Sequence, residues 1–147
     1  MYLALKTLHI IGVVLFLGNI TTGIFWKLAA DRSGDVRAIA QAIEGILQAD
    51  RWFTQPGATL ILLSGLALTW VGGYPFSTFW IWGGLALFVL SAVIFKLAVE
   101  PAQRRMLAAI RSDDRETYQA ESRRWMWSGT LATLAPYGAL VLMVMKP

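Results

Sequence analysis

The twenty residues Phe79–Ala98, FWIWGGLALFVLSAVIFKLA, decide the fold of this chain. They contain a single charged residue, Lys96. Twenty residues at a helical rise of about 1.5 Å cross about 30 Å of hydrocarbon. In that solvent every backbone polar group must find a partner within its own segment, and the stretch lacks the alternation of a barrel strand. It therefore predicts a transmembrane helix.

Apolar runs of similar length lie on both sides of this stretch. The expected spans are about residues 3–28, 54–71, 79–98 and 128–145. Each approaches or exceeds the length that a bilayer core requires. The sequence thus predicts one all-α domain over residues 1–147, a polytopic membrane protein built as a four-transmembrane-helix bundle. The first run is too long for the apolar core of a signal peptide, so we expect the mature chain to begin at Met1.

The composition excludes several classes of protein. Hydrophobic residues make up 56% of the chain and charged residues only 15%, against about 25% charged residues in soluble domains. There is no cysteine, which excludes disulfides, thiolate metal sites and cysteine nucleophiles. The net charge of +4 does not indicate a nucleic-acid partner, because the basic residues flank the apolar runs. We therefore expect the lipid bilayer, and no nucleic acid, as the partner of this chain.

The basic residues predict the orientation of the spans. Two long connections hold all of them except Lys6 and Lys146. They are Lys27, Arg32, Arg37 and Arg51 in the first connection, and Lys96, Arg104, Arg105, Arg111, Arg115, Arg123 and Arg124 in the second. The positive-inside bias places both connections in the cytoplasm and both termini outside. The same cluster of charge is expected to attract anionic lipid at the cytoplasmic face.

The first connection carries a helical pattern of its own. Apolar residues recur at helical spacing from Val36 to Leu47, directly after Asp35, which is a good N-cap residue. The pattern predicts an amphipathic helix that lies at the membrane surface.

Small residues and one proline predict where the helices approach each other. Small residues recur seven apart on three of the runs, which places each pair on one helix face. The pairs are Gly57 and Ser64, Gly84 and Ser91, and Gly129 and Pro136. Because Pro136 has no backbone donor, the carbonyl of Ala132 is expected to lose its helical partner, and Thr133 or a water is expected to replace it.

Polar residues within an apolar span are candidate functional residues, because burying them in hydrocarbon is costly. At about 100° per residue, Gly12, Asn19 and Gly23 lie within about 80° of His9 on the first span. This face, with an imidazole, a carboxamide and two gaps, is the expected pocket. Imidazole suits both haem iron and copper, so His9 is the candidate metal ligand. The alternative is a neutral His9 that only joins helices by hydrogen bonds.

The second ligand of a haem is not obvious, since His9 is the only histidine. The sequence offers His9 of a second subunit, which would require a homodimer, a methionine such as Met143 or Met145, or a lysine. Lys96 is followed one turn later by Glu100. That pair could handle a proton or an anionic headgroup, although ordinary surface ion pairs have the same spacing.

Six stretches of the sequence resemble a bacterial family of integral membrane proteins known as domain of unknown function two-two-six-nine. They are Leu5–Gly12, Gly18–Asn19, Phe25–Lys27, Ala49–Gly57, Ser64–Leu68 and Val99–Gln103. The likeness covers most of the chain. It implies four helices in a bacterial inner membrane, N-out and C-out by the charge bias, and no established activity.

The chain also has a more distant likeness to HemJ-type protoporphyrinogen oxidases and to CopD-like copper proteins. These are compact helical membrane proteins with a histidine early in the first helix, in a context similar to Leu5–His9. HemJ-type proteins bind haem b and also use a lysine late in the third helix, a position that Lys96 matches. The resemblance implies haem b, ahead of copper, as a cofactor held by His9 and Lys96, although this chain has no second histidine.

The leading hypothesis is an inner-membrane protein that binds haem b or a related flat cofactor through His9, for redox or porphyrin chemistry. The alternative is a non-enzymatic accessory or structural membrane protein in which His9 and Asn19 only pack helices. A carrier of small solutes or protons is a third class, and the sequence disfavours it because no carboxylate is expected within the spans.

Overall fold

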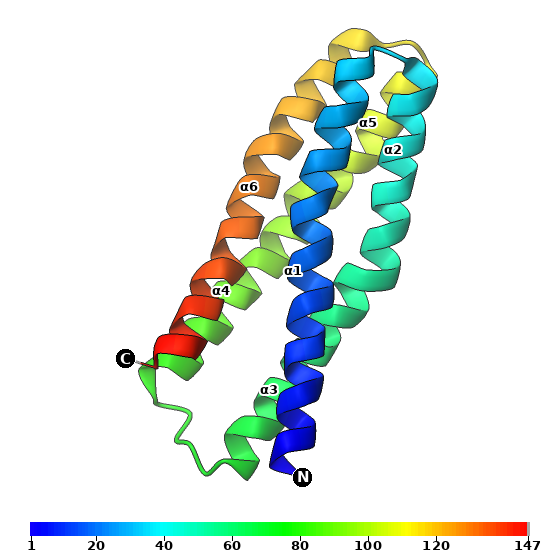
Figure 1. Cartoon of the computed structure of the whole chain (residues 1–147). Coiled ribbons are helices and arrows are strands. Elements are labelled where there is room, and N and C mark those ends of the chain that lie inside the picture. Colours follow the sequence, from blue (N-terminus) through cyan, green and yellow to red (C-terminus); the bar gives the residue numbers. More distant parts are fainter. Residues whose placement is uncertain (147) are drawn as a thin grey trace.

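The computed structural model describes residues 1–146, which form helices joined by short turns and by the loop 72–78 (Figure 1). The elements are α1 (Tyr2–Ser33), α2 (Val36–Ala49), η1 (Asp50–Thr54), α3 (Gln55–Val71), α4 (Phe79–Ile94), η2 (Phe95–Val99), α5 (Glu100–Arg111) and α6 (Arg115–Met145). Four continuous helices are long and apolar enough to cross a membrane: Tyr2–Ser33, Val36–Val71, Phe79–Arg111 and Arg115–Met145. The predicted all-α bundle with four membrane helices is confirmed.

These helices are longer than the expected spans. The shortest has 31 residues, which at 1.5 Å per residue is about 46 Å, against about 30 Å of hydrocarbon. The excess lies at one end of the bundle, which we call the basic end because most of the arginines are there. It consists of the end of α1, α2, α5 and the start of α6 (Figure 1). The opposite end, which we call the termini end, holds both termini and the loop 72–78.

The predicted amphipathic helix after Asp35 is present as α2, but its apolar face packs against protein instead of facing a membrane surface. Asp35 does cap the helix, since its Oδ1 accepts a hydrogen bond from Arg37 N at 2.8 Å. However, α2 runs on through η1 into α3 (Figure 1). Its apolar stripe, Ile39, Ile43 and Ile46, is buried against protein. The stripe packs on α5 and α1 rather than lipid, because those helices extend alongside it.

Two of the long helices each contain a π-helical segment that ends two residues before a proline. In η1 the widened turn Asp50–Thr54 precedes Pro56, and in η2 the turn Phe95–Val99 precedes Pro101. A proline inside a helix removes one donor and clashes with the carbonyl four residues earlier, and a widened turn relieves both problems. Neither π-helical turn was predicted from the sequence. Such turns are frequent at functional sites.

The helices pack as two pairs. Helix α1 lies along α3, and α4 lies along α6, over most of their lengths. The pairs join mainly at the basic end, through α2, α5 and α6, and they separate toward the termini end (Figure 1). Of the glycines predicted to allow close contact, Gly57 and Gly84 do so, whereas a Cβ on Gly129 would meet no atom within 4 Å. A Cβ on Gly12 would meet Ile61 N at 3.1 Å and Gly57 O at 3.2 Å.

The carbonyl released by Pro136 finds a partner on another helix. Ser91 Oγ of α4 donates a hydrogen bond to Ala132 O of α6 at 2.6 Å. Ser91 is buried, with 2% of its surface exposed. The predicted loss of the helical partner at Ala132 is thus compensated across the α4–α6 contact, by Ser91 rather than by Thr133.

Candidate functional site

The residues expected to form one pocket are divided between two cavities. His9 lines a cavity of about 360 Å³ between the helix pairs at the termini end, which we call the termini-end cleft. Asn19, Gly23 and Lys96 line a second cavity of about 330 Å³, which we call the basic-end cavity. Gly12 lines neither, because it forms the close contact with α3 described above.

The imidazole of His9 has a defined tautomer. Its Nδ1 lies 3.1 Å from Ile61 O and 3.1 Å from Ser64 Oγ. A carbonyl only accepts hydrogen bonds, so Nδ1 must carry the proton. Ser64 Oγ donates to Leu60 O and is therefore also an acceptor for Nδ1. The lone pair of neutral His9 is then on Nε2, which makes no hydrogen bond to any residue in 1–146.

The wall of the cleft is apolar except at a few points. Gly65 leaves room for the imidazole, since a Cβ there would lie 3.1 Å from His9 Cε1. Met143 also lines the cleft, and its methyl group would meet a Cβ on Gly84. Lys6 and Lys146 contribute two positive charges. The ammonium of Lys146 lies 5.2 Å from the centre of the Trp80 ring, a cation–π distance.

Two phenylalanines stand between the cavities. Phe16 of α1 and Phe88 of α4 line both of them, and their ring centres are 5.7 Å apart. Phe16 is almost fully buried, with 7% of its surface exposed. The two rings form an apolar partition across the bundle.

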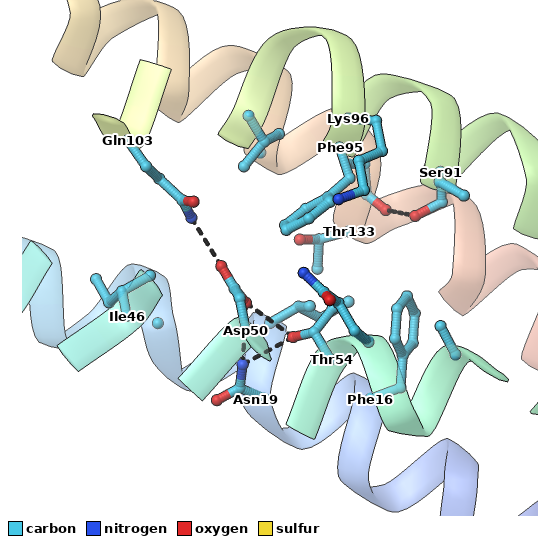
Figure 2. Close-up of a pocket in the computed structure, with 18 of the residues that line it drawn as sticks. Phe16, Asn19, Ile46, Asp50, Thr54, Ser91, Phe95, Lys96, Gln103 and Thr133 are labelled. Atoms are coloured by element: carbon cyan, nitrogen blue, oxygen red, sulfur yellow. Dashed lines mark hydrogen bonds between the residues drawn. The ribbon is translucent and has the colours of Figure 1, made fainter. Parts of the chain in front are cut away.

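The basic-end cavity is organised around a buried carboxylate that the sequence analysis did not select, Asp50. Asp50 Oδ1 accepts hydrogen bonds from Asn19 Nδ2 at 3.1 Å and from Thr54 Oγ1 at 2.8 Å. Asp50 Oδ2 accepts one from Gln103 Nε2 at 2.9 Å. Figure 2 shows these side chains converging from α1, η1 and α5. Only 6% of the surface of Asp50 is exposed.

All the partners of Asp50 are neutral. Lys96, across the cavity on η2, pairs instead with Glu100 at 2.8 Å, and 58% of its side chain is exposed (Figure 2). The buried Lys27 pairs with Asp31 at 2.6 Å, at the basic end. No salt bridge of Asp50 occurs among residues 1–146. Its carboxylate therefore has hydrogen-bond donors but no counter-ion, which is an unusual state for a buried group.

Asp50 was missed because the second span was expected to begin at Thr54. The adjacent Arg51 makes the segment look like part of a cytoplasmic connection. Asp50 is 31 positions from Asn19 and 53 from Gln103 in the sequence, so no local pattern reveals the cluster. Pro56 is the sequence feature that could have pointed to Asp50. A proline within a long helical pattern indicates a distorted turn just before it, and Asp50 lies in that turn.

The family described as "Predicted integral membrane protein (DUF2269)" matches residues 3–147. No curated protein and no solved structure matches the chain.

Proposed function

Because the chain belongs to the DUF2269 family of predicted integral membrane proteins, we propose that it acts within the bilayer, by binding haem b in the termini-end cleft. The observation that carries the proposal is the tautomer of His9. Its Nδ1 is held by a backbone carbonyl, and its Nε2 is left without a protein partner. Histidine ligands of metals commonly have this arrangement, in which the second nitrogen fixes the ring.

The donor set favours haem over a bare metal ion such as copper. Residues 1–146 contain no group of three or more His, Cys, Asp or Glu side chains that could hold a metal ion. A porphyrin supplies four nitrogen ligands itself, so a single imidazole is enough to attach it. Copper bound by this chain would have to rely on His9 and thioethers such as Met143.

The charges of the cleft suit an amphiphile that carries carboxylates. Lys6 and Lys146 both line it, and the rest of the wall is largely apolar. Haem b has this chemistry, with a flat apolar ring and two propionates. In this proposal His9 would hold the haem iron with Met143 of the same cleft, and the two lysines would pair with the propionates. Bound haem would supply one-electron chemistry.

This proposal differs from the family likenesses in one residue. Lys96, which the HemJ-type resemblance implies as a partner of His9, lines the basic-end cavity instead. The partition of Phe16 and Phe88 lies between that cavity and the cleft. Since Met143 lines the cleft of the same chain, a homodimer with two His9 ligands is not required.

A specific observation favours a second candidate function, that of an accessory membrane protein without a cofactor. His9 of α1 hydrogen-bonds Ile61 and Ser64 of α3, and Asn19 hydrogen-bonds Asp50 and Thr54 of η1. Both side chains therefore join helices, which is the role that this alternative assigns to them.

The location that we propose is the bacterial inner membrane, with the basic end in the cytoplasm. Exposed arginines are concentrated there, among them Arg104, Arg105 and Arg111. The positive-inside bias assigns such an end to the cytoplasm, next to anionic lipid. Reporter fusions at Gly73 and at the C-terminus are then expected on the outer side, and a fusion at Asp113 on the cytoplasmic side.

Visible spectroscopy separates the two candidate functions. The protein is purified in mild detergent, titrated with haem b, and compared with His9→Ala and Lys96→Ala. We expect a Soret band in the wild type and in Lys96→Ala, and its loss in His9→Ala. Because Lys96 lies in the other cavity, Lys96→Ala is a matched control for the loss of a polar side chain. A colourless wild-type protein that binds no haem would leave the accessory function.

A further inference from the structure

The basic-end cavity holds a carboxylate with unused acceptor capacity. A carboxylate offers about four lone-pair positions. Two donors occupy Oδ1 of Asp50, from Asn19 and Thr54, and one donor occupies Oδ2, from Gln103. One position on Oδ2 is therefore free, although Asp50 itself is 6% exposed.

Two further polar atoms of the cavity are buried without a hydrogen-bond partner in the described part of the chain. They are Gln103 Oε1 and Trp125 Nε1. Both residues line the cavity, and their exposed fractions are only 2% and 3%. Gln103 Nε2 donates to Asp50 Oδ2 at 2.9 Å, which leaves Gln103 Oε1 outside that hydrogen bond. Gln103 Oε1 is thus an unsatisfied acceptor beside the carboxylate (Figure 2).

The cavity also has aromatic walls. Phe16, Phe88, Phe95 and Trp125 all line it. The faces of aromatic rings attract cations, most strongly where water is excluded. An uncompensated carboxylate, a free carbonyl acceptor and several rings together favour one class of ligand, a cation with N–H donors.

We infer that the basic-end cavity is a binding site for a small protonated amine. The ammonium donates hydrogen bonds to Asp50 Oδ2 and Gln103 Oε1, and its charge compensates that of the carboxylate. The Trp125 N–H remains as a donor to a hydroxyl or carbonyl oxygen elsewhere on the ligand. The site is independent of the haem proposal, since it lies beyond the Phe16–Phe88 partition and shares no polar residue with the termini-end cleft.

The two π-helical turns give this site its shape. Asp50 and Thr54 come from η1, and Phe95 and Lys96 come from η2, on the other side of the cavity (Figure 2). A widened turn displaces side chains from the regular helical positions. The turns therefore account for the inward position of Asp50 on a helix whose neighbouring residue, Arg51, is exposed.

Isothermal titration of the full chain in a non-ionic detergent tests the inference. The probe is ethanolammonium, which is small, polar enough to stay out of micelles, and carries both N–H donors and a hydroxyl. Ethylene glycol is the neutral probe of the same size, and tetramethylammonium is a cation without N–H donors. We expect binding of ethanolammonium at millimolar concentration or below, and binding of the other two to be weaker by about tenfold or more.

Three variants connect the binding to the cavity. Asp50→Asn removes the charge with little change of shape. It is expected to weaken the binding of ethanolammonium by about tenfold or more. Gly129→Leu fills the cavity and keeps Asp50. An added Cβ at Gly129 meets no atom within 4 Å, so this variant is expected to fold and to lose binding. Asp113→Asn, at a carboxylate that is 79% exposed, is the control and should bind as the wild type does.

Several outcomes would overturn the inference. They are a wild type that does not bind millimolar ethanolammonium, equal binding of ethylene glycol, or undiminished binding in Gly129→Leu. If Asp50→Asn does not fold, Gly129→Leu and the comparison of the probes still decide the question.

Discussion

The two cavities of this bundle are similar in size and opposite in chemistry. The termini-end cleft lies between helix pairs that separate, and its polar residues are few, among them His9, Lys6 and Lys146. The basic-end cavity lies where the pairs join, and there three side chains donate hydrogen bonds to Asp50. In the cleft the main polar group is held by one neighbouring helix. In the basic-end cavity the main polar group, Asp50, is held from α1, η1 and α5.

This difference suggests different consequences for mutation. The groups of the cleft contribute little to holding the helices together, so changing them should affect ligand binding more than stability. The network of the cavity joins α1, η1 and α5, so changing it should affect stability as well. The close contact between Gly12 of α1 and Gly57 of α3 lines neither cavity, so changing it should affect stability only.

The largest effect is expected at that contact. In Gly12→Leu the new side chain would start 3.1 Å from Ile61 N and 3.2 Å from Gly57 O, which are backbone atoms that cannot move aside. We expect a loss of about 3 kcal/mol in the free energy of unfolding. Denaturation in detergent measures it.

Gly23→Leu is the matched control, because an added Cβ at Gly23 has only Ile46 Cγ2, at 3.9 Å, within 4 Å. It should fold like the wild type while reducing the volume of the basic-end cavity. If Gly12→Leu and Gly23→Leu lower the free energy of unfolding equally, the close contact at Gly12 is not the cause of the destabilisation.

The next effect is expected at Asp50. Asp50→Ala leaves Gln103 Nε2 without its acceptor and takes one acceptor from Asn19, which still has Thr54 Oγ1 at 2.8 Å. The expected cost is about 2 kcal/mol in the free energy of unfolding. Asp113→Asn, at the surface and at a backbone φ of 57° that asparagine also tolerates, should change it by less than about 0.5 kcal/mol. If Asp50→Ala is as stable as the wild type, the network makes no net contribution to the free energy of unfolding. Buried charged groups in other proteins can behave in this way.

A smaller effect is expected where Pro136 interrupts α6. Ser91→Ala removes the only side-chain donor to Ala132 O given by the structure, at a cost of about 1 kcal/mol. Pro136→Ala restores a backbone donor for the same carbonyl. The cost of Ser91→Ala should therefore fall in the Pro136→Ala background, and a double-mutant cycle of melting temperatures measures the change. Additive effects of the two substitutions would contradict this account of the carbonyl.

The smallest effect on stability is expected at His9. His9→Ala loses a hydrogen bond between α1 and α3, worth about 1 kcal/mol or less in a membrane. The melting temperature in detergent should change little, whereas haem content should fall to background. A large loss of stability with unchanged haem content would reverse the roles that we assign to the cleft.

The sequence was sufficient for the membrane helices because hydrophobic length is a local property. It was not sufficient for their ends, since charges such as Arg51 mark the edge of hydrocarbon and not the end of a helix. The helix that carries Arg51 in fact continues from Val36 to Val71. For the same reason Asp50, one residue earlier, was left out of the candidate site.

The grouping of His9 with Asn19 and Gly23 shows a second limit. A helical wheel compares directions around the axis and ignores distance along it. Asn19 lies ten residues from His9 in the sequence, which is about 15 Å along a helix. That distance is enough to place the two residues in different cavities, on either side of Phe16.

The measurement that tests the central claim most directly is a pair of titrations, with haem b and with ethanolammonium, on the wild type, His9→Ala and Asp50→Asn. If the protein has two separate sites, the wild type binds both ligands and each variant loses one. His9→Ala should lose the Soret band and keep ethanolammonium, while Asp50→Asn should keep the Soret band and lose ethanolammonium. Full haem loading of His9→Ala, or loss of both ligands in a folded variant, would contradict the account.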